Sequence, residues 1–153
     1  MTRHIEVLEN SFQQIVPYQD AFAEALYERL FTQCPHVHDL FAHTDMRQQR
    51  KKLMASLGLV MSTLRQPEQL PAILKQLGQR HEAYGVQPEH YALLATVLLE
   101  TLADFLGNQW TTELRAAWLA AYETIVALML AGYSTPLEGK SKVEVEIEIK
   151  VRE

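Results

Sequence analysis

The sequence predicts an all-α domain followed by a strand-like tail, and three observations support this prediction. Apolar residues recur at steps of three and four through most of residues 1–133, which is the period of an amphipathic helix. Proline and glycine residues divide that part into helix-length segments. The segment KVEVEIEIKVR instead alternates apolar and charged residues, as a strand does. We therefore expect one domain over residues 1–133 and a tail over residues 134–153.

Three helical segments are expected before residue 45. The first is HIEVLENSFQQIV, which has apolar residues on one face and is ended by Pro17. The second runs from about Tyr18 to Thr32 and carries Tyr27 on its apolar stripe. The third, CPHVHDLF, is a short helical turn with Pro35 in its first position. The polar stretch AHTDMR that follows is typical of a loop.

Four further helices complete the predicted domain, over residues 48–64, 71–84, 88–106 and 112–131. Gly85 and Gly107 each stand at the position favoured just after a helix C-terminus. Thr111 or Thr112 caps the last helix. We expect Tyr84 and Phe105 to lie on buried faces of their helices. The domain thus has six main helices and one short turn.

The tail has no strand to pair with inside an all-α domain. Three alternatives follow for residues 134–153. The tail leads to a further domain, pairs with another chain and makes an oligomer, or is disordered.

Composition excludes several classes of protein. The formal net charge of -5 argues against nucleic-acid binding, which needs a basic face. No apolar run reaches the roughly 20 residues of a membrane span. The N-terminus lacks the apolar segment of a signal peptide. Cys34 is the single cysteine, so no intrachain disulfide forms, and the chain suits a reducing, cytoplasmic compartment.

His81 is the most informative side chain in the sequence. The helix over residues 71–84 places Leu74, Leu77 and His81 on one apolar face. On this helix alone, two interpretations are open. His81 is a core histidine bonded to a backbone carbonyl, or it is the axial ligand of a haem iron in an apolar pocket. Because the sequence has no Cys-x-x-Cys-His motif, such a haem would be noncovalent.

The other histidines do not compete with His81. His90 lies one residue off an apolar stripe and should face outward. The remaining histidines have no zinc-site spacing, and we interpret them as surface residues: His4, His36, His38 and His43.

Tyr27 and Gln49 are polar residues on otherwise apolar stripes. Taken singly, each is most simply a residue at the edge of the core. Together with His81, they predict an apolar pocket with one imidazole and two hydrogen-bonding groups.

Three strings in this order resemble the bacterial globins, which comprise single-domain bacterial haemoglobins and the globin half of flavohaemoglobins. They are LFTQCPHVHDLF, QRKKLM and LGQRHEAYGV. Tyr27 lies 14 residues before Phe41, and Gln49 lies 32 residues before His81, as the family's spacing requires. The resemblance covers about residues 3–133 and implies a globin fold around a pocket for haem b.

The resemblance also implies roles for individual residues. His81 would be the proximal iron ligand, oriented by the carbonyl of Leu77. Tyr27 and Gln49 would be the distal donors to a bound ligand. The remaining haem contacts would be Phe41 on the haem plane, Leu53 on the distal wall, Lys52 at a propionate, Val86 at the haem edge and Tyr91 near the proximal histidine. The simpler interpretations are ordinary core for Phe41 and a solvated side chain for Lys52.

Two departures from the flavohaemoglobin pattern matter. A glutamate late in the last helix of that family is absent here, because the corresponding position is Tyr133. This puts in doubt an electron-rich proximal ligand and peroxidase-like chemistry. The chain also has no room for flavin and nicotinamide modules, so catalytic turnover would need an external reductase.

We therefore expect reversible binding of O₂, CO and NO at a five-coordinate ferrous haem, for oxygen transport or storage. The alternatives are nitric oxide dioxygenation with an external reductase, a haem-based gas sensor, and a cofactor-free helical interaction module.

Overall fold

The computed structural model describes residues 2–134, and this part contains six α-helices, three 3₁₀ segments and no strand. The α-helices are α1 (Thr2–Ile15), α2 (Gln19–Gln33), α3 (Met46–Thr63), α4 (Leu70–Ala83), α5 (Pro88–Leu106) and α6 (Thr112–Leu130). The 3₁₀ segments are η1 (Val16–Tyr18), η2 (Pro35–Phe41) and η3 (Gly107–Gln109). The all-α prediction is confirmed, and η2 is the predicted short turn. The predicted strand of the tail lies outside the described residues.

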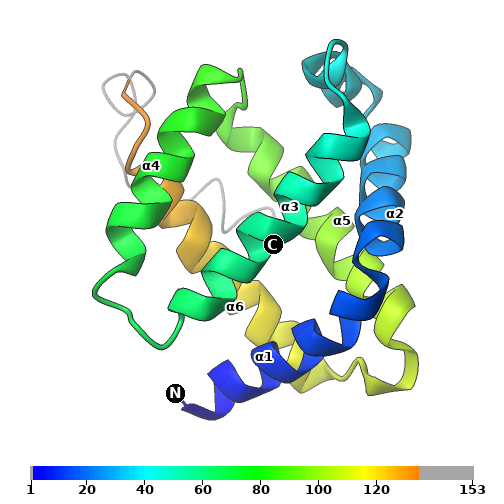
Figure 1. The fold of residues 1–153 in the computed structure, drawn as a ribbon, viewed down its shortest axis with the longest axis vertical. Coiled ribbons are helices and arrows are strands. Elements are labelled where there is room, and N and C mark those ends of the chain that lie inside the picture. The colour runs from blue at the N-terminus through cyan, green and yellow to red at the C-terminus, as the bar shows by residue number, and fades with distance from the viewer. Residues whose placement is uncertain (1, 135–153) are drawn as a thin grey trace.

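The helices form two packed groups that share α5 and α6. Figure 1 shows α2 on one side of the molecule and α4 on the other, with α3, α5 and α6 between them. α2 packs on α5 and α3, whereas α4 packs mainly on α6. Buried apolar residues accordingly form a larger cluster around Phe22, Leu26 and Leu102, and a smaller one around Leu74 and Val126. The candidate site residues come from both groups.

Helix caps explain where two helices begin. The carboxylate of Asp45 accepts hydrogen bonds from the backbone N–H groups of Arg47 and Gln48. This cap satisfies amides that the helix itself leaves unpaired, and it starts α3 two residues before the predicted position. At α6, the hydroxyl of Thr111 accepts from the backbone N–H of Leu114 at 3.1 Å. Thr111 is therefore the capping residue of the two that the sequence offered.

The crossing of α4 and α6 depends on two glycines that the sequence did not single out. A Cβ atom at Gly78 would overlap the carbonyl oxygen of Met129, and one at Gly132 would overlap the carbonyl oxygen of Lys75. Both obstacles are backbone atoms. The two helices therefore approach more closely than any other side chain would allow.

Two predictions of burial are wrong. Tyr84 is 67% exposed, because α4 ends at Ala83 and the turn that follows carries its ring off the apolar face. Phe105 is 36% exposed at the end of α5, although one edge of its ring packs on Phe22 with ring centroids 5.3 Å apart.

One helical segment, Pro88–Gln109, is long and apolar enough to cross a membrane by length and composition alone. Its apolar residues have partners inside the fold, since Val97, Leu98 and Leu102 belong to the larger buried cluster. The same pattern is expected of the central helix of a packed domain.

Candidate functional site

The turn after α4 holds His81 at a helix end of defined geometry. The backbone N–H of Val86 donates to the carbonyl of His81 at 3.0 Å, and that of Gly85 donates to Glu82 at 3.0 Å. Gly85 has φ 94°, a left-handed conformation that favours glycine. These two bonds and this conformation define a Schellman C-cap. The cap stops the helix one turn after His81 and brings Val86 back toward it.

The imidazole of His81 is oriented by the preceding turn of its own helix. Its Nδ1 atom donates to the carbonyl of Leu77 at 2.8 Å, as the sequence predicted. Since a carbonyl only accepts, Nδ1 carries the proton and Nε2 carries a lone pair. Burial lowers the pKa of His81, which favours the neutral ring. Among the described residues, no hydrogen bond joins Nε2 to another group, so this atom is free to bind a metal.

The described residues around His81 do not form a metal site built from several protein ligands. No group of three or more His, Cys, Asp or Glu side chains capable of holding a metal ion occurs within residues 2–134. A single imidazole holds a metal firmly when the metal brings its other ligands with it, as a haem iron does. A core histidine would also bond to a carbonyl, but His81 is only partly buried.

A chain of tyrosines adjoins His81 on the same side. The rings of His81 and Tyr91 are stacked, with centroids 6.3 Å apart and planes 29° apart. The hydroxyl of Tyr133 donates to the carbonyl of Val86 at 2.8 Å. Because this bond uses the one proton of Tyr133, the hydroxyl of Tyr91 is the donor in their 2.8 Å hydrogen bond. The relay therefore runs from Tyr91 through Tyr133 to a neutral carbonyl.

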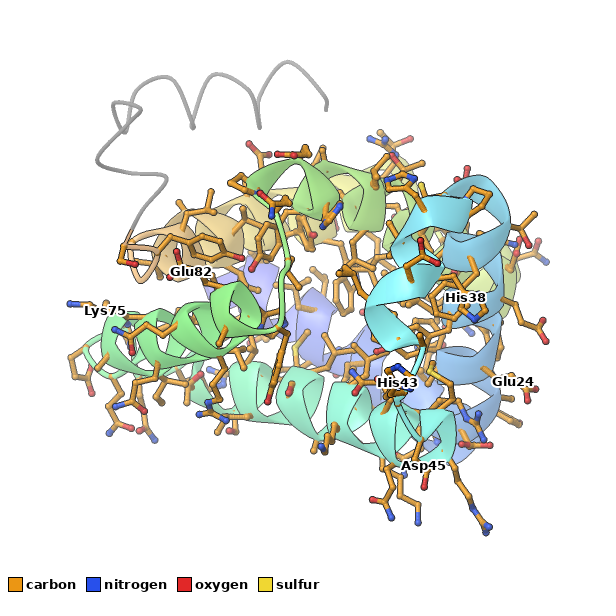
Figure 2. The ribbon with its side chains drawn as sticks, turned by 90° about the horizontal axis from the view of Figure 1, so that it is seen from above. Glu24, His38, His43, Asp45, Lys75 and Glu82 are labelled. Carbon is orange, nitrogen blue, oxygen red and sulfur yellow. The ribbon has the colours of Figure 1, made fainter. Side chains whose placement is uncertain are left out.

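This relay is uncharged at neutral pH. Burial raises the pKa of Tyr133 to about 12 and raises the pKa of Tyr91 as well. Tyr122 braces the relay by donating to the carbonyl of Tyr91 at 2.6 Å. Next to it, the backbone N–H of Ser134 donates to Glu82 at 3.2 Å, and Figure 2 shows Glu82 beside the end of α6. The end of α6 is thus joined to the turn that carries His81.

Tyr133 and Tyr122 were missed by the sequence analysis. Tyr133 appeared there only as the residue that stands where a glutamate was sought. The hydrogen-bond partners of Tyr133 are Tyr91 and Val86, which are more than 40 residues away in the sequence. No local pattern could therefore identify these bonds, and the only available indication was that Tyr133 follows the last predicted helix.

Tyr27 and Gln49 lie next to each other although they come from different helices. The side-chain amide of Gln49 donates to the hydroxyl oxygen of Tyr27 at 3.1 Å. This bond leaves the proton of the Tyr27 hydroxyl available to another acceptor. Tyr27 is 7% exposed, and burial raises the pKa of its hydroxyl, so it keeps that proton at neutral pH.

The other predicted site residues differ in their burial. Phe41, at the end of η2, packs edge-on against Tyr27 with centroids 5.6 Å apart. The ring of Phe31 joins this group and also contacts His38, which Figure 2 shows on the η2 side of the molecule. Three apolar residues of the predicted site are partly buried: Leu53, Leu77 and Val86. Lys52 is exposed and forms no ion pair among the described residues.

His90 has a structural role that is distinct from metal binding. Its Nδ1 atom accepts a hydrogen bond from the backbone N–H of Gln87 at 3.0 Å, which completes a capping box at the start of α5. The ring of His36 lies 5.9 Å away. Burial, and then the charge of His36, lower the pKa of His90, while Glu89 opposes them.

We expect the capping bond of His90 to make stability depend on pH. Because the folded state lowers the pKa of His90, its contribution is complete above the pKa of the unfolded chain, near 6.5, and is lost as pH falls. His90→Gln keeps an acceptor at this position but does not titrate. Urea unfolding between about pH 7.5 and pH 5.5 should therefore show a steeper loss of stability in the wild type. Equal losses in the two proteins would assign the bond no role in pH dependence.

Comparisons with known proteins identify the family of this chain. The family model described as Globin matches residues 24–129. The chain is 32% identical to Neuroglobin of Danio rerio over 110 residues, which cover 72% of this chain and 69% of that protein. It is 31% identical over 124 residues to Flavohemoprotein of Rhizobium meliloti (strain 1021), covering 80% of this chain. The chain belongs to the globin family.

Two further comparisons concern length and fold. This chain spans 30% of the length of the Rhizobium meliloti Flavohemoprotein, but 94% of Neuroglobin of Tetraodon nigroviridis, to which it is 28% identical. A solved structure from Pseudomonas aeruginosa PAO1, described as structurally highly homologous to a human hemoglobin, superposes with a TM-score of 0.76. The superposition covers 86% of this chain and 99% of the Pseudomonas aeruginosa chain. Because the sequence identity is 23%, this similarity shows the fold alone.

Proposed function

We propose that this globin holds haem b noncovalently through His81 and reversibly binds O₂, CO and NO in the cytoplasm. The observation that carries the proposal is the neutral imidazole of His81, with Nδ1 committed to Leu77 and Nε2 free. When bound, the haem iron supplies the coordination bond to a diatomic gas. In this proposal His81 would be the one protein ligand to a five-coordinate ferrous iron.

The other residues shape the two sides of the site. Tyr27 and Gln49 are the polar groups on the distal side, with Leu53 as the apolar wall and Phe41 against the haem plane. On the proximal side, Leu77 orients His81, Val86 would contact the haem edge, and Tyr91 lies beside His81. Lys52, which is exposed, would meet a propionate. These assignments combine the geometry of the described residues with the family resemblance.

The Tyr27 hydroxyl tests this function directly. O₂ gains partial negative charge when it binds ferrous haem, so a donor in an apolar setting holds it more firmly than in water. Tyr27 has a free proton for this purpose, because Gln49 donates to its oxygen. We expect Tyr27→Phe to speed O₂ dissociation by about tenfold, which corresponds to roughly 1.4 kcal/mol. Stopped-flow displacement of O₂ by CO measures this rate.

Two controls accompany this prediction. CO is a poorer acceptor, so its dissociation should change much less in Tyr27→Phe. Gln49→Leu should act in the same direction as Tyr27→Phe but more weakly, since its amide already bonds to Tyr27. If Tyr27→Phe leaves O₂ dissociation within about twofold of the wild type, Tyr27 only fills space and the distal-donor role fails.

Nitric oxide dioxygenation with an external reductase is the second candidate function. The similarity to Flavohemoprotein favours it. The neutral relay from Tyr91 to Tyr133 does not supply the carboxylate that the flavohaemoglobin pattern would place there. Sustained consumption of nitric oxide by the haem-loaded protein, a flavin reductase and a nicotinamide donor would establish this activity.

A further inference from the structure

Charge is distributed unequally between the segments of this fold. Residues 45–82, which hold α3, the connection to α4, and α4 up to its penultimate residue, carry seven Lys and Arg side chains and three Asp and Glu side chains, a formal charge of +4. Residues 4–44 and 83–134 together carry two Lys and Arg side chains and eleven Asp and Glu side chains, a formal charge of -9. The same two helices, α3 and α4, carry Gln49, Lys52 and His81. The basic segment is therefore also the part of the chain that supplies these three candidate site residues.

The basic side chains of α3 form a ridge, which we define as Arg47, Lys51, Lys52 and Leu59. All four are exposed. Arg47 and Lys51 lie one turn apart, and Lys52 and Leu59 lie two turns apart, so the four form two neighbouring rows on the exposed part of the helix. Leu59 is 47% exposed and is one of four large hydrophobic residues exposed in the described part of the chain. The ridge thus combines three positive charges with one apolar contact point.

The ridge charges are not used to hold the fold together. Within residues 2–134, Arg50 pairs with Asp20 at 2.9 Å and Arg65 pairs with Glu9 at 2.8 Å. Arg47, Lys51 and Lys52 form no ion pair in this part of the chain. These three positive charges can therefore attract an acidic partner protein. At physiological salt the attraction is screened beyond a Debye length of roughly 8–10 Å.

We propose that this ridge is the docking surface for an acidic electron-carrier protein that reduces the ferric haem. This inference rests on the proposed function, because it requires the haem. Each encounter moves one electron from a reduced iron–sulfur or flavin centre of the carrier to the ferric iron; the carrier is oxidised, the iron becomes ferrous, and no atom is transferred. Lys52 of the ridge lies about one turn after Gln49 on α3, so a carrier seated on the ridge lies at the edge of the candidate site.

A compact acidic protein fits the ridge better than nucleic acid does. A long polyanion would also meet the acidic remainder of the molecule, with its formal charge of -9. A small carrier protein need touch only the ridge, and Leu59 would supply the apolar part of that contact. Interfaces between electron-transfer partners are typically small. Charge complementarity of this kind raises the rate of association more than the final affinity.

The experiment compares two double variants that change the net charge equally. Arg47→Glu with Lys51→Glu reverses the ridge and leaves Lys52 in place. Lys75→Glu with Arg115→Glu reverses two exposed charges elsewhere, and Figure 2 shows Lys75 pointing outward from α4. Reduced plant-type [2Fe–2S] ferredoxin is the probe, because it is an acidic carrier of single electrons. The rate of reduction of ferric haem-loaded protein is followed by stopped flow between roughly 20 mM and 500 mM NaCl.

We expect the wild-type rate to fall by about tenfold or more across this salt range. The ridge variant should lose about tenfold at low salt and become insensitive to salt, whereas the control variant should stay within about twofold of the wild type. Reduction by dithionite, a small reagent that needs no docking, should be alike in all three. An equal loss in both double variants, or a wild-type rate independent of salt, would overturn the proposal.

A second measurement does not depend on the haem. Zero-length carbodiimide coupling to the same ferredoxin, followed by peptide mapping, should link Lys51 and Lys52 in preference to Lys75. Preference for Lys75, the absence of coupling, or tight binding of duplex DNA in place of ferredoxin would each overturn the docking surface. If dithionite yields no ferrous haem spectrum, the proposed function has failed, and the coupling pattern still decides whether the ridge binds an acidic protein.

Discussion

Replacing His81 by alanine is expected to abolish tight haem binding. The variant removes the one protein nitrogen available to iron in the proposed site, while Leu77 and the rest of α4 stay in place. Altering an outer partner of a metal ligand typically costs 10–100-fold in affinity. Removing the ligand itself should therefore weaken haem binding by about 100-fold or more. Titration of the haem-free protein with haem, followed at the Soret band, measures the change.

Two controls separate ligand loss from misfolding. Since His81 is only partly buried, the haem-free variant should unfold at nearly the wild-type temperature. Free imidazole, added to His81→Ala, should restore part of the wild-type spectrum by supplying the missing nitrogen. His90→Ala should keep the wild-type ferrous and CO spectra, because His90 caps α5. If His81→Ala keeps these spectra and His90→Ala loses them, His81 is not the ligand.

Gly78→Ala is expected to destabilise the fold by about 3 kcal/mol or more. The added Cβ would overlap the carbonyl oxygen of Met129 and lie 2.6 Å from its carbonyl carbon. Neither atom can rotate away, so α4 must separate from α6 and loosen the cluster around the fully buried Leu74. The midpoint of urea unfolding of the haem-free protein measures the loss.

Gly58→Ala is the matched control for this prediction. Gly58 lies inside α3, and a Cβ there would meet nothing within 4 Å. In a helix interior, alanine is favoured over glycine by roughly 0.5–1 kcal/mol. The same substitution should therefore stabilise the protein at Gly58 and destabilise it at Gly78. Similar effects at the two sites would show that helix propensity outweighs the close approach of α4 and α6.

The helices could be predicted from sequence because their signals are local. Apolar periodicity and proline located all six, and Gly85 marked the end of α4 correctly. The start of α3 was placed late, because the cap from Asp45 begins the helix inside a polar stretch that resembles a loop. Tyr84 was misplaced for a related reason: periodicity assumes that the helix continues, and the C-cap stops it.

The candidate site could be predicted from the sequence only in part. Residues that lie on one face of one helix could be related to each other by their spacing, whereas contacts between helices could not. The sequence placed His81 and Leu77 one helical turn apart on the same apolar stripe, and the resemblance implied the bond between them. Apolar stripes predicted that Tyr27 and Gln49 share a pocket, but their direct hydrogen bond depends on how α2 packs on α3, which no local pattern encodes. The pairing of Tyr91 with Tyr133 and the crossing at Gly78 depend on how whole helices pack, and no local pattern encodes that. The contacts of Lys52, Leu53 and Val86 with haem stay predictions.

The bond from Tyr133 to Val86 sets a boundary for shortening this protein. The last described residue, Ser134, comes directly after Tyr133 and is tied to Glu82 on the same turn. A chain cut after residue 134 keeps both links between the end of α6 and the turn below His81. A chain cut after residue 132 loses both, although every helix remains intact. The minimal unit that preserves the proximal side therefore extends four residues beyond the end of its last helix, to residue 134.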